Sequence, residues 1–279
     1  MRSGFVTFVG RPNVGKSTLL NAICGEKVSI VSNKPQTTRT RIRGVWNRGD
    51  TQIVFVDTPG IHKPVSALGE RVNATALDGA DDVDVVCLLI DATEPFGRGD
   101  RWVADRIDIS KAFVIVNKTD RASPSKVLTQ LAAVGALGAA EYFPVSAKNG
   151  QGVDVLLAKL SDRMPDGPKY FPDGMITDTP EAQWVAELVR EQLLHLLEDE
   201  LPYSIATRVT QWEWPLVKCE IIVERESQKG MVIGKSGDLL KKVGVAARAQ
   251  MPDGAYLELK VVVDKNWQRN AEKVRQLGY

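Results

Sequence analysis

The chain has 279 residues, which is enough for one large domain or two ordinary ones, and two is the number we expect. Hydrophobic residues make up 43% and charged residues 25%, as in soluble globular proteins, and the net charge of +1 excludes a global attraction to nucleic acid or membranes. The three cysteines are too far apart for a disulfide framework or a zinc site, and the longest apolar run, residues 85–90, is too short to span a bilayer. We therefore expect a soluble, cytoplasmic protein without a targeting segment.

Strands and helices are predicted to alternate in the first half of the chain. Apolar and β-branched runs predict strands at residues 4–9, 43–47, 51–56, 83–91, 112–116 and 142–145, and amphipathic stretches predict helices at 17–22, 101–107, 128–137 and 153–160. Every candidate site in this half follows a strand at its carboxyl end. The order is typical of an α/β fold with a doubly wound, mostly parallel sheet, which binds ligands at that edge.

A phosphate-binding loop follows the first strand, because residues 10–17 match the pattern G-x-x-x-x-G-K-[ST] between a strand and a helix. The glycines let backbone N–H groups point at phosphate oxygens, and the helix N-terminus adds a positive dipole. Lys16 is placed to reach the β- and γ-phosphates, and the Ser17 hydroxyl to bind Mg²⁺. The nucleotide-binding residues predicted here are Gly10, Arg11, Pro12, Asn13, Val14, Gly15, Lys16, Ser17 and Thr18.

Two later segments are predicted to complete the phosphate site. Residues 32–41 are polar and basic, so we expect a mobile surface loop, in which Thr37 and Thr38 are both candidates for a hydroxyl that joins the Mg²⁺ shell only while the γ-phosphate is present. The strand at 51–56 runs into Asp57-Thr58-Pro59-Gly60. Asp57 is placed there to hold Mg²⁺ through water, and the Gly60 N–H to approach the γ-phosphate.

Two motifs predict recognition of guanine. Asn117-Lys118-Thr119-Asp120 follows the strand at 112–116. Guanine presents two donors that the Asp120 carboxylate can accept together, adenine does not, and Asn117 and Lys118 would frame the ring, so an ATPase is disfavoured. Ser146-Ala147-Lys148 stands at the next strand end, where a backbone N–H is placed to bond the guanine carbonyl.

These motifs, in this order over residues 1–165, resemble those of the translation-factor-related class of GTPases. The resemblance implies GTP hydrolysis to GDP and phosphate, and it favours Thr38 as the switch threonine, so that Ser17, Thr38 and Asp57 are the predicted metal ligands. Ile61 stands where Ras-type GTPases carry a glutamine that orients water. Relatives with this substitution depend on a potassium ion near an asparagine of the phosphate loop, here Asn13; His62 is an alternative base. The predicted catalytic residues are Lys16, Thr38, Gly60 and Asn13.

The second half of the chain has a different pattern. Prolines and glycines at 165–180 indicate an interdomain linker. Beyond it we expect a helix at 183–197, strands at 203–211 and 216–226, two short helices around Gly234-Lys235-Ser236-Gly237, a strand at 256–263 and a helix at 267–277. This order and the Gly-x-x-Gly loop resemble a type II KH domain, an α+β fold that clamps single-stranded RNA. The predicted RNA-binding residues are Lys229, Gly234, Lys235, Ser236, Gly237, Lys241, Lys242 and Arg248.

The predicted organisation is a GTP-binding domain at residues 1–165, a linker at 166–180 and a KH-type domain at 181–279. GTPases of this class that carry such a KH domain bind 16S ribosomal RNA near its 3′ end and assist assembly of the 30S subunit, so the resemblance implies this role here, for a monomer using GTP or GDP and Mg²⁺. The alternative is a regulatory GTPase whose C-terminal domain docks on a protein or on the inner face of the cell membrane, as a peripheral protein. RNA binding that depends on the Gly-Lys-Ser-Gly loop would distinguish the two.

Overall fold

The computed structural model describes residues 1–35, 37–57, 59, 68 and 83–279. These residues form two compact units. The first contains residues 1–29, 38–57 and 83–178, and the second contains residues 179–279 together with the short segment around residues 30–37. None of the helices in the described part of the chain has the length and apolar character needed to cross a membrane.

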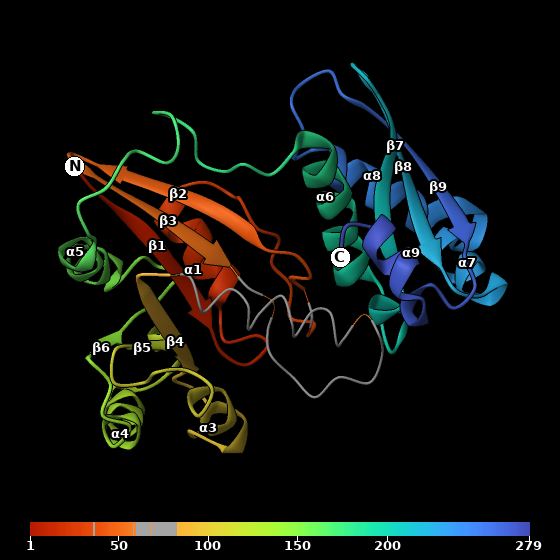
Figure 1. Cartoon of the computed structure of the whole chain (residues 1–279). Helices are drawn as coiled ribbons and strands as arrows, with labels where there is room; N and C mark the ends of the chain where they lie inside the picture. The colour runs from red at the N-terminus through yellow and green to blue at the C-terminus, as the bar shows by residue number, and fades with distance from the viewer. Residues whose placement is uncertain (36, 58, 60–67, 69–82) are drawn as a thin grey trace. The chain divides into compact units, whose positions relative to one another are not determined.

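The first unit is built on a six-stranded sheet with the order β2-β3-β1-β4-β5-β6 (Figure 1). The β2–β3 pair is an antiparallel hairpin, as predicted, and the other neighbours are parallel. Parallel pairing puts the carboxyl ends of β1, β3, β4 and β5 at one edge of the sheet. The strands are β1 (Arg2–Val9), β2 (Ile42–Arg48), β3 (Thr51–Asp57), β4 (Val85–Asp91), β5 (Phe113–Asn117) and β6 (Glu141–Pro144).

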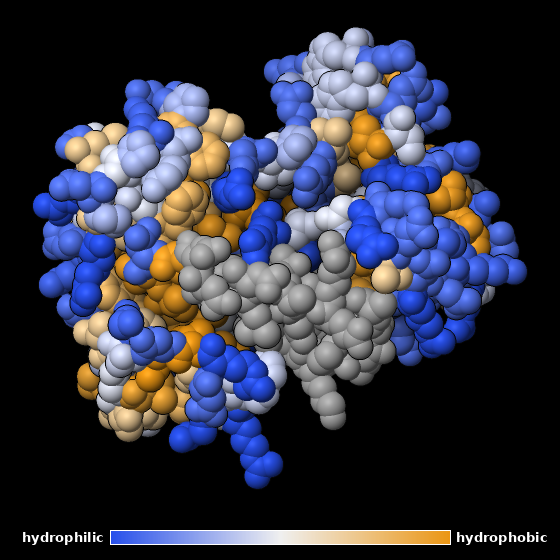
Figure 2. All heavy atoms as spheres, viewed as in Figure 1, coloured by the Kyte–Doolittle hydropathy of each residue, from blue (hydrophilic) through white to orange (hydrophobic). Residues whose placement is uncertain are grey.

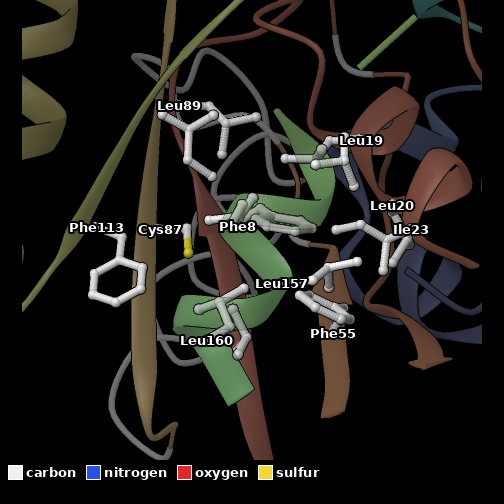
Figure 3. Packing of buried hydrophobic residues seen from close by; sticks show 14 of the residues in the cluster. Phe8, Leu19, Leu20, Ile23, Phe55, Cys87, Leu89, Phe113, Leu157 and Leu160 are labelled. Atoms are coloured by element: carbon white, nitrogen blue, oxygen red, sulfur yellow. The ribbon is translucent and has the colours of Figure 1, made fainter. Parts of the chain in front are cut away.

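Helices cover both faces of this sheet because its strands are apolar on both sides. On one face, Phe8 and Phe55 stack with their ring centroids 5.4 Å apart under the leucines of α1 and α5 (Figure 3). On the other face, Val9, Leu88 and Val116 pack against α3 and α4. The helices are α1 (Lys16–Cys24), α3 (Arg98–Ala104), α4 (Pro124–Gly135) and α5 (Val153–Arg163), with a 3₁₀ turn η1 (Thr119–Arg121).

The proline-rich segment that follows α5 has no helix or regular strand, but residues 166–178 belong to the first compact unit. The buried Gln52 side chain of β3 donates to the Phe171 carbonyl and accepts from the Tyr170 N–H. The Tyr170 ring lies 4.7 Å from that of Phe5. The division between the units therefore falls at residues 178–179, near the end of the predicted linker.

The second unit is a three-stranded sheet with the order β7-β8-β9, in which β7–β8 is antiparallel and β8–β9 parallel (Figure 1). One core joins the apolar stripe of α6 to these strands and to Val232, Val243 and Ala247. Trp267 is fully buried and donates from Nε1 to the Ser204 carbonyl. The elements are α6 (Glu181–Leu196), η2 (Leu201–Tyr203), β7 (Ala206–Glu213), β8 (Leu216–Val223), α7 (Glu226–Ile233), η3 (Lys235–Gly237), α8 (Asp238–Arg248), β9 (Tyr256–Val263), η4 (Trp267–Arg269) and α9 (Ala271–Gln276).

The predicted fold class is confirmed, and several predicted helices have different ends; the helix predicted at 128–137, for example, runs from Pro124 to Gly135. The helix predicted at 101–107 runs from Arg98 to Ala104, because the Asp100 carboxylate accepts from the Gly97 N–H and fixes an earlier start. The helix predicted at 267–277 is divided, because the Asn270 side chain caps a new helix by accepting from the N–H groups of Glu272 and Lys273.

Candidate functional site

The loop between β1 and α1 owes its shape to two glycines. A Cβ on Gly15, where φ is +99°, would lie 2.3 Å from the Asn117 side-chain nitrogen. A Cβ on Gly10 would lie 2.7 Å from the Leu89 carbonyl oxygen. The loop therefore lies directly on the ends of β4 and β5, and α1 begins at its end, at Lys16. Backbone donors and the helix dipole thus converge at one place.

The Lys16 side chain is buried within this loop. Its ammonium donates to the carbonyls of Gly10 and Arg11 at 3.3 and 3.1 Å. Burial lowers the pKa of Lys16 to about 8, although the Asp57 carboxylate acts in the opposite direction. A buried cation on a phosphate loop is suited to the negative charge of a triphosphate. That charge would raise the pKa of Lys16 again and so favour its protonated form.

Oxygen atoms from four side chains, distant in the sequence, meet beside Lys16. Ser17 Oγ donates to Asp57 Oδ2 at 2.6 Å and lies 3.0 Å from Thr38 Oγ1. Ser29 Oγ also donates to Asp57 Oδ2, at 3.1 Å. Burial raises the pKa of Asp57, while Lys16 and these three hydroxyl groups lower it. Asp57 Oδ1 is buried and has no hydrogen-bond partner among the described residues.

The two candidate switch threonines have different surroundings. Thr38 is buried, and its hydroxyl lies with Ser17 and Asp57, whereas the Thr37 hydroxyl donates to the Lys34 carbonyl. The expectation of an exposed loop is wrong for Thr38 and Arg39, which are 6% and 2% exposed, because Thr38 faces the buried carboxylate. The hydroxyl and carboxylate oxygens, with one orphaned acceptor, are the donor set that Mg²⁺ prefers.

The base motif lies at the end of β5 and joins three loops. Asn117 donates from Nδ2 to the Val14 carbonyl at 2.9 Å and accepts at Oδ1 from the Ala147 N–H at 3.0 Å. Its amide therefore ties the phosphate loop to the Ser146-Ala147-Lys148 loop. Asp120 is exposed and accepts at Oδ1 from Ser146 Oγ at 2.7 Å. Lys148 is also exposed.

Some predicted site residues fall outside the described part of the chain. They are Thr58 and Gly60, together with Ile61 and His62. Of the remaining motif residues, Pro59 is buried, and Asn13 is exposed with a φ of 64° at the turn of the phosphate loop. Arg11, Pro12 and Thr18 are half-buried, and Val14 belongs to the core under α1.

The predicted RNA-binding residues occupy two helices and the loop between them. Gly234 and Gly237 both have positive φ, at 75° and 82°, and the Lys235 and Ser236 side chains between them are exposed. Lys229 lies on α7 and is half-buried. Lys241 and Lys242 line a hollow of about 480 Å³ with Gln192 and His195 of α6, and Arg248 lines a second hollow with residues 251–255. The cations are therefore spread along α7 and α8 instead of gathering at the glycine loop, on a unit whose face in Figure 2 is mostly hydrophilic.

Sequence reasoning missed three residues that hold the nucleotide motifs in place. Ser29 reaches Asp57, Asp91 accepts from the Lys118 ammonium at 2.6 Å, and Asp100 accepts from Arg11 Nε at 2.7 Å. Asp91 had a usable signal, because it is the last residue of a buried strand between two site-bearing strands. Nothing in the local sequence marked Ser29 or Asp100.

A phosphate loop, an oxygen cluster for Mg²⁺ and a base motif at one sheet edge define a P-loop GTPase, and the glycine loop of the second unit defines a KH domain. Comparison with known proteins agrees with both assignments. Residues 5–118 match the family described as 50S ribosome-binding GTPase, and residues 200–268 match the KH domain family.

The chain belongs to the Era family of GTPases. It is 46% identical to GTPase Era of Mycolicibacterium smegmatis over 295 residues, which cover 100% of this chain and 99% of the relative, and 45% identical to GTPase Era of Mycobacterium tuberculosis. Its structure superimposes on that of a variant of Aquifex aeolicus Era bound to GDP·AlF4⁻ with a TM-score of 0.95 and 38% identity, covering 100% and 99% of the two chains. An Era structure with MgGDPNP and nucleotides 1506–1542 of 16S ribosomal RNA matches equally well. The chain is accordingly a GTPase that uses GTP, GDP and Mg²⁺.

Proposed function

We propose that this chain is a GTP-hydrolysing switch that binds 16S ribosomal RNA near its 3′ end and assists assembly of the 30S subunit, as a monomer in the cytoplasm. The observation that carries the proposal is the joining of a phosphate site and a base site on one sheet edge to a KH domain with an exposed Lys235-Ser236 loop. The Era structure bound to a 16S fragment supports the RNA target. Peripheral contact with the cell membrane stays a prediction from the sequence.

At the phosphate end, the loop from Gly10 to Thr18 binds the phosphates through its backbone N–H groups. Lys16 places its ammonium beside the β- and γ-phosphates, where negative charge grows as the terminal phosphoryl group leaves. Ser17 and Thr38 would hold Mg²⁺ through their hydroxyl oxygens, and Asp57, whose Oδ1 has no partner among the described residues, would hold it through water. When bound, Mg²⁺ neutralises charge on the β- and γ-phosphate oxygens.

Hydrolysis needs a group that orients the attacking water, and Ile61 is a hydrocarbon in the sequence. We assign this part to the backbone of the switch segment at Gly60 and to a potassium ion that would be held near Asn13, an exposed residue of the phosphate loop. His62 is the alternative base.

At the base end, Asp120 accepts the two donors of guanine, and Ser146 holds the carboxylate in place by its hydrogen bond. Lys118 borders the base, and a backbone N–H of the Ser146-Ala147-Lys148 loop bonds the guanine carbonyl. In the KH domain, the two glycines allow the RNA backbone to approach closely, and Lys235 contacts a phosphate. Lys229, Lys241, Lys242 and Arg248 extend the positive surface along the two helices.

The test is a crossed pair of variants in the full chain. Asp120→Asn exchanges an acceptor for a donor, so affinity for GTP should fall by roughly 30- to 1000-fold and affinity for xanthosine triphosphate should rise, while RNA binding is kept. Lys235→Asp with Ser236→Asp should abolish binding of single-stranded RNA and leave nucleotide binding unchanged.

Each variant is the folding control for the other activity. Lys235→Ala alone should lower the salt dependence of RNA binding by one phosphate contact, a slope change of about 0.7. Unchanged GTP affinity in the first variant rejects the base assignment. RNA binding as tight as that of the parent in the second variant rejects the KH assignment and favours a docking domain for a protein or a membrane.

A further inference from the structure

The segment that joins β4 to α3, residues 91–100, belongs to none of the nucleotide motifs, yet its acidic residues contact two of them. At its start, Asp91 accepts from Lys118 Nζ at 2.6 Å. Near its middle, Glu94 accepts from Arg11 at 2.9 Å, and at its end Asp100 accepts from Arg11 Nε at 2.7 Å. Lys118 belongs to the base motif and Arg11 to the phosphate loop.

We propose that this segment, which we call the acidic strap, positions both ends of the nucleotide: Asp91 fixes Lys118 beside the base and Asp100 fixes Arg11 in the phosphate loop. These two carboxylates are positioning residues, because they act through the cations that they hold. The inference rests on the nucleotide site proposed above and extends it by residues that none of its motifs contains.

Asp91 is itself held in a single orientation. It is 6% exposed, and its Oδ1 accepts from the Thr93 N–H at 2.8 Å and from Thr93 Oγ1 at 2.6 Å, which leaves Oδ2 for Lys118. Burial alone would raise the pKa of Asp91, but the hydrogen bonds from Lys118 and Thr93 hold it below its usual value. The carboxylate is therefore charged, and a charged acceptor in a buried setting holds an ammonium strongly.

Asp100 is fixed in the same way at the other end. It is 1% exposed, and while Oδ1 accepts from Arg11, Oδ2 accepts from the Gly97 N–H at 3.0 Å. The Arg11 side chain runs so close to the helix that a Cβ on Gly99 would lie 2.6 Å from its Cδ. Glu94 is 59% exposed, so its contact with Arg11 is screened and contributes less.

The strap is tied to the core of the unit between these two contacts. The buried Gln130 side chain of α4 donates to the Asp91 carbonyl at 3.4 Å and accepts from the Phe96 N–H at 3.1 Å. The Ala92 N–H donates to the Asn117 carbonyl at 2.8 Å. A rigid strap with a carboxylate at each end keeps a fixed spacing between the base motif and the phosphate loop.

The strap acts through Lys118 of the base motif and Arg11 of the phosphate loop, which GTP and GDP both contact, so it should act equally on the two nucleotides. We expect Asp91→Asn and Asp100→Asn each to weaken both nucleotides by the same factor, about tenfold or more, measured with the full-length protein by titration calorimetry. Asp108→Asn is the matched control, because Asp108 is an exposed carboxylate of the same unit that forms an ion pair with Lys111 at 3.2 Å. It should leave both affinities unchanged.

A double-mutant cycle separates positioning from simple stabilisation of the fold. In a Lys118→Met background, Asp91→Asn should cost less than about twofold in affinity, because the cation that it positions is gone. The same holds for Asp100→Asn in an Arg11→Met background. If Asp91→Asn does not fold, Thr93→Val tests the same end of the strap, because it removes one donor to Asp91. This variant should weaken the binding of both nucleotides. In the Lys118→Met background it should cause no additional loss of affinity.

The proposed role of the strap is overturned if the single variants lose no nucleotide affinity, or if the full loss of affinity persists in the Lys118→Met and Arg11→Met backgrounds. A parent protein and an Asp108→Asn control that fail to prefer guanine over adenine nucleotides would overturn the nucleotide site itself. The two failures are therefore distinct.

Discussion

The two glycines of the Gly-Lys-Ser-Gly loop should respond very differently to the same substitution. Gly234 has φ 75° and ψ 178°, a region of the backbone map that is nearly closed to residues with a Cβ. Gly237 has φ 82° and ψ 9°, a left-handed conformation that alanine adopts at modest cost. The change to be made is Gly234→Ala in one protein and Gly237→Ala in another.

The surroundings increase the difference. A Cβ on Gly234 would lie 2.8 Å from the Leu239 Cβ and 3.0 Å from the Leu239 N, both of which are fixed at the start of α8, whereas a Cβ on Gly237 would meet nothing within 4 Å. We expect Gly237→Ala to lower the free energy of unfolding of this unit by about 1 kcal/mol and Gly234→Ala by about 3 kcal/mol. With a urea m-value of about 2 kcal/mol/M, the two midpoints should differ by about 1 M.

Tryptophan fluorescence during urea unfolding measures both values. Replacing Trp46 and Trp102 with Phe silences the first unit and leaves the tryptophans of the second unit, including the buried Trp267. Gly237→Asn is the control for backbone strain, because asparagine tolerates the left-handed conformation. Equal midpoints for the two alanine variants, or a larger loss for Gly237→Ala, would show that the loop does not have this conformation.

Three further outcomes are expected. GTP hydrolysis should be faster in potassium than in sodium, and Asn13→Ala should remove the difference; equal rates in the parent would count against the ion. Burial lowers the pKa of Lys16 to about 8 and bound phosphates raise it again, so GDP binding at pH 9 should take up protons and become weaker as the pH rises. Calorimetry in two buffers of different ionisation enthalpy measures this proton uptake, and a binding heat that is the same in both buffers would contradict it. Burial, assisted by Glu26, raises the pKa of Cys24 to about 12. At pH 8, iodoacetamide should therefore label Cys24 about 1000-fold more slowly than a thiol of pKa 9, as measured by mass spectrometry, until guanidinium unfolds the chain. Fast labelling of the native protein would contradict the burial of this thiol.

The sequence was sufficient to predict most of the sheet and the identity of its functional edge. The apolar runs before Gly10, Asp57, Asn117 and Ser146 all become parallel strands of one sheet, so their carboxyl ends lie at the same edge. Spacing alone left Thr37 and Thr38 equivalent. The structure separates them, because only Thr38 is directed at the buried Asp57.

The contacts between motifs were not predictable from local pattern. Asn117 bonds Val14 at a sequence separation of 103 residues, and Arg11 bonds Asp100 at a separation of 89. Such pairs depend on which strands become neighbours and on the depth of each loop, which no window of the sequence contains. The same reason explains residues 166–178, where prolines indicate an irregular segment correctly but do not reveal that Gln52 anchors it.

The charges around Lys16 and Asp57 explain why a bound nucleotide should stabilise the first unit more than the area of the nucleotide's contact with the protein suggests. Burial lowers the pKa of the cation Lys16 and raises that of the anion Asp57, so both shifts disfavour the charged forms that catalysis needs. Phosphates add negative charge beside Lys16, and Mg²⁺ adds positive charge beside Asp57. The ligand therefore relieves two unfavourable burials that the unfolded chain never experiences. That relief is added to the ordinary binding free energy, and it ties the stability of the first unit to the nucleotide it holds.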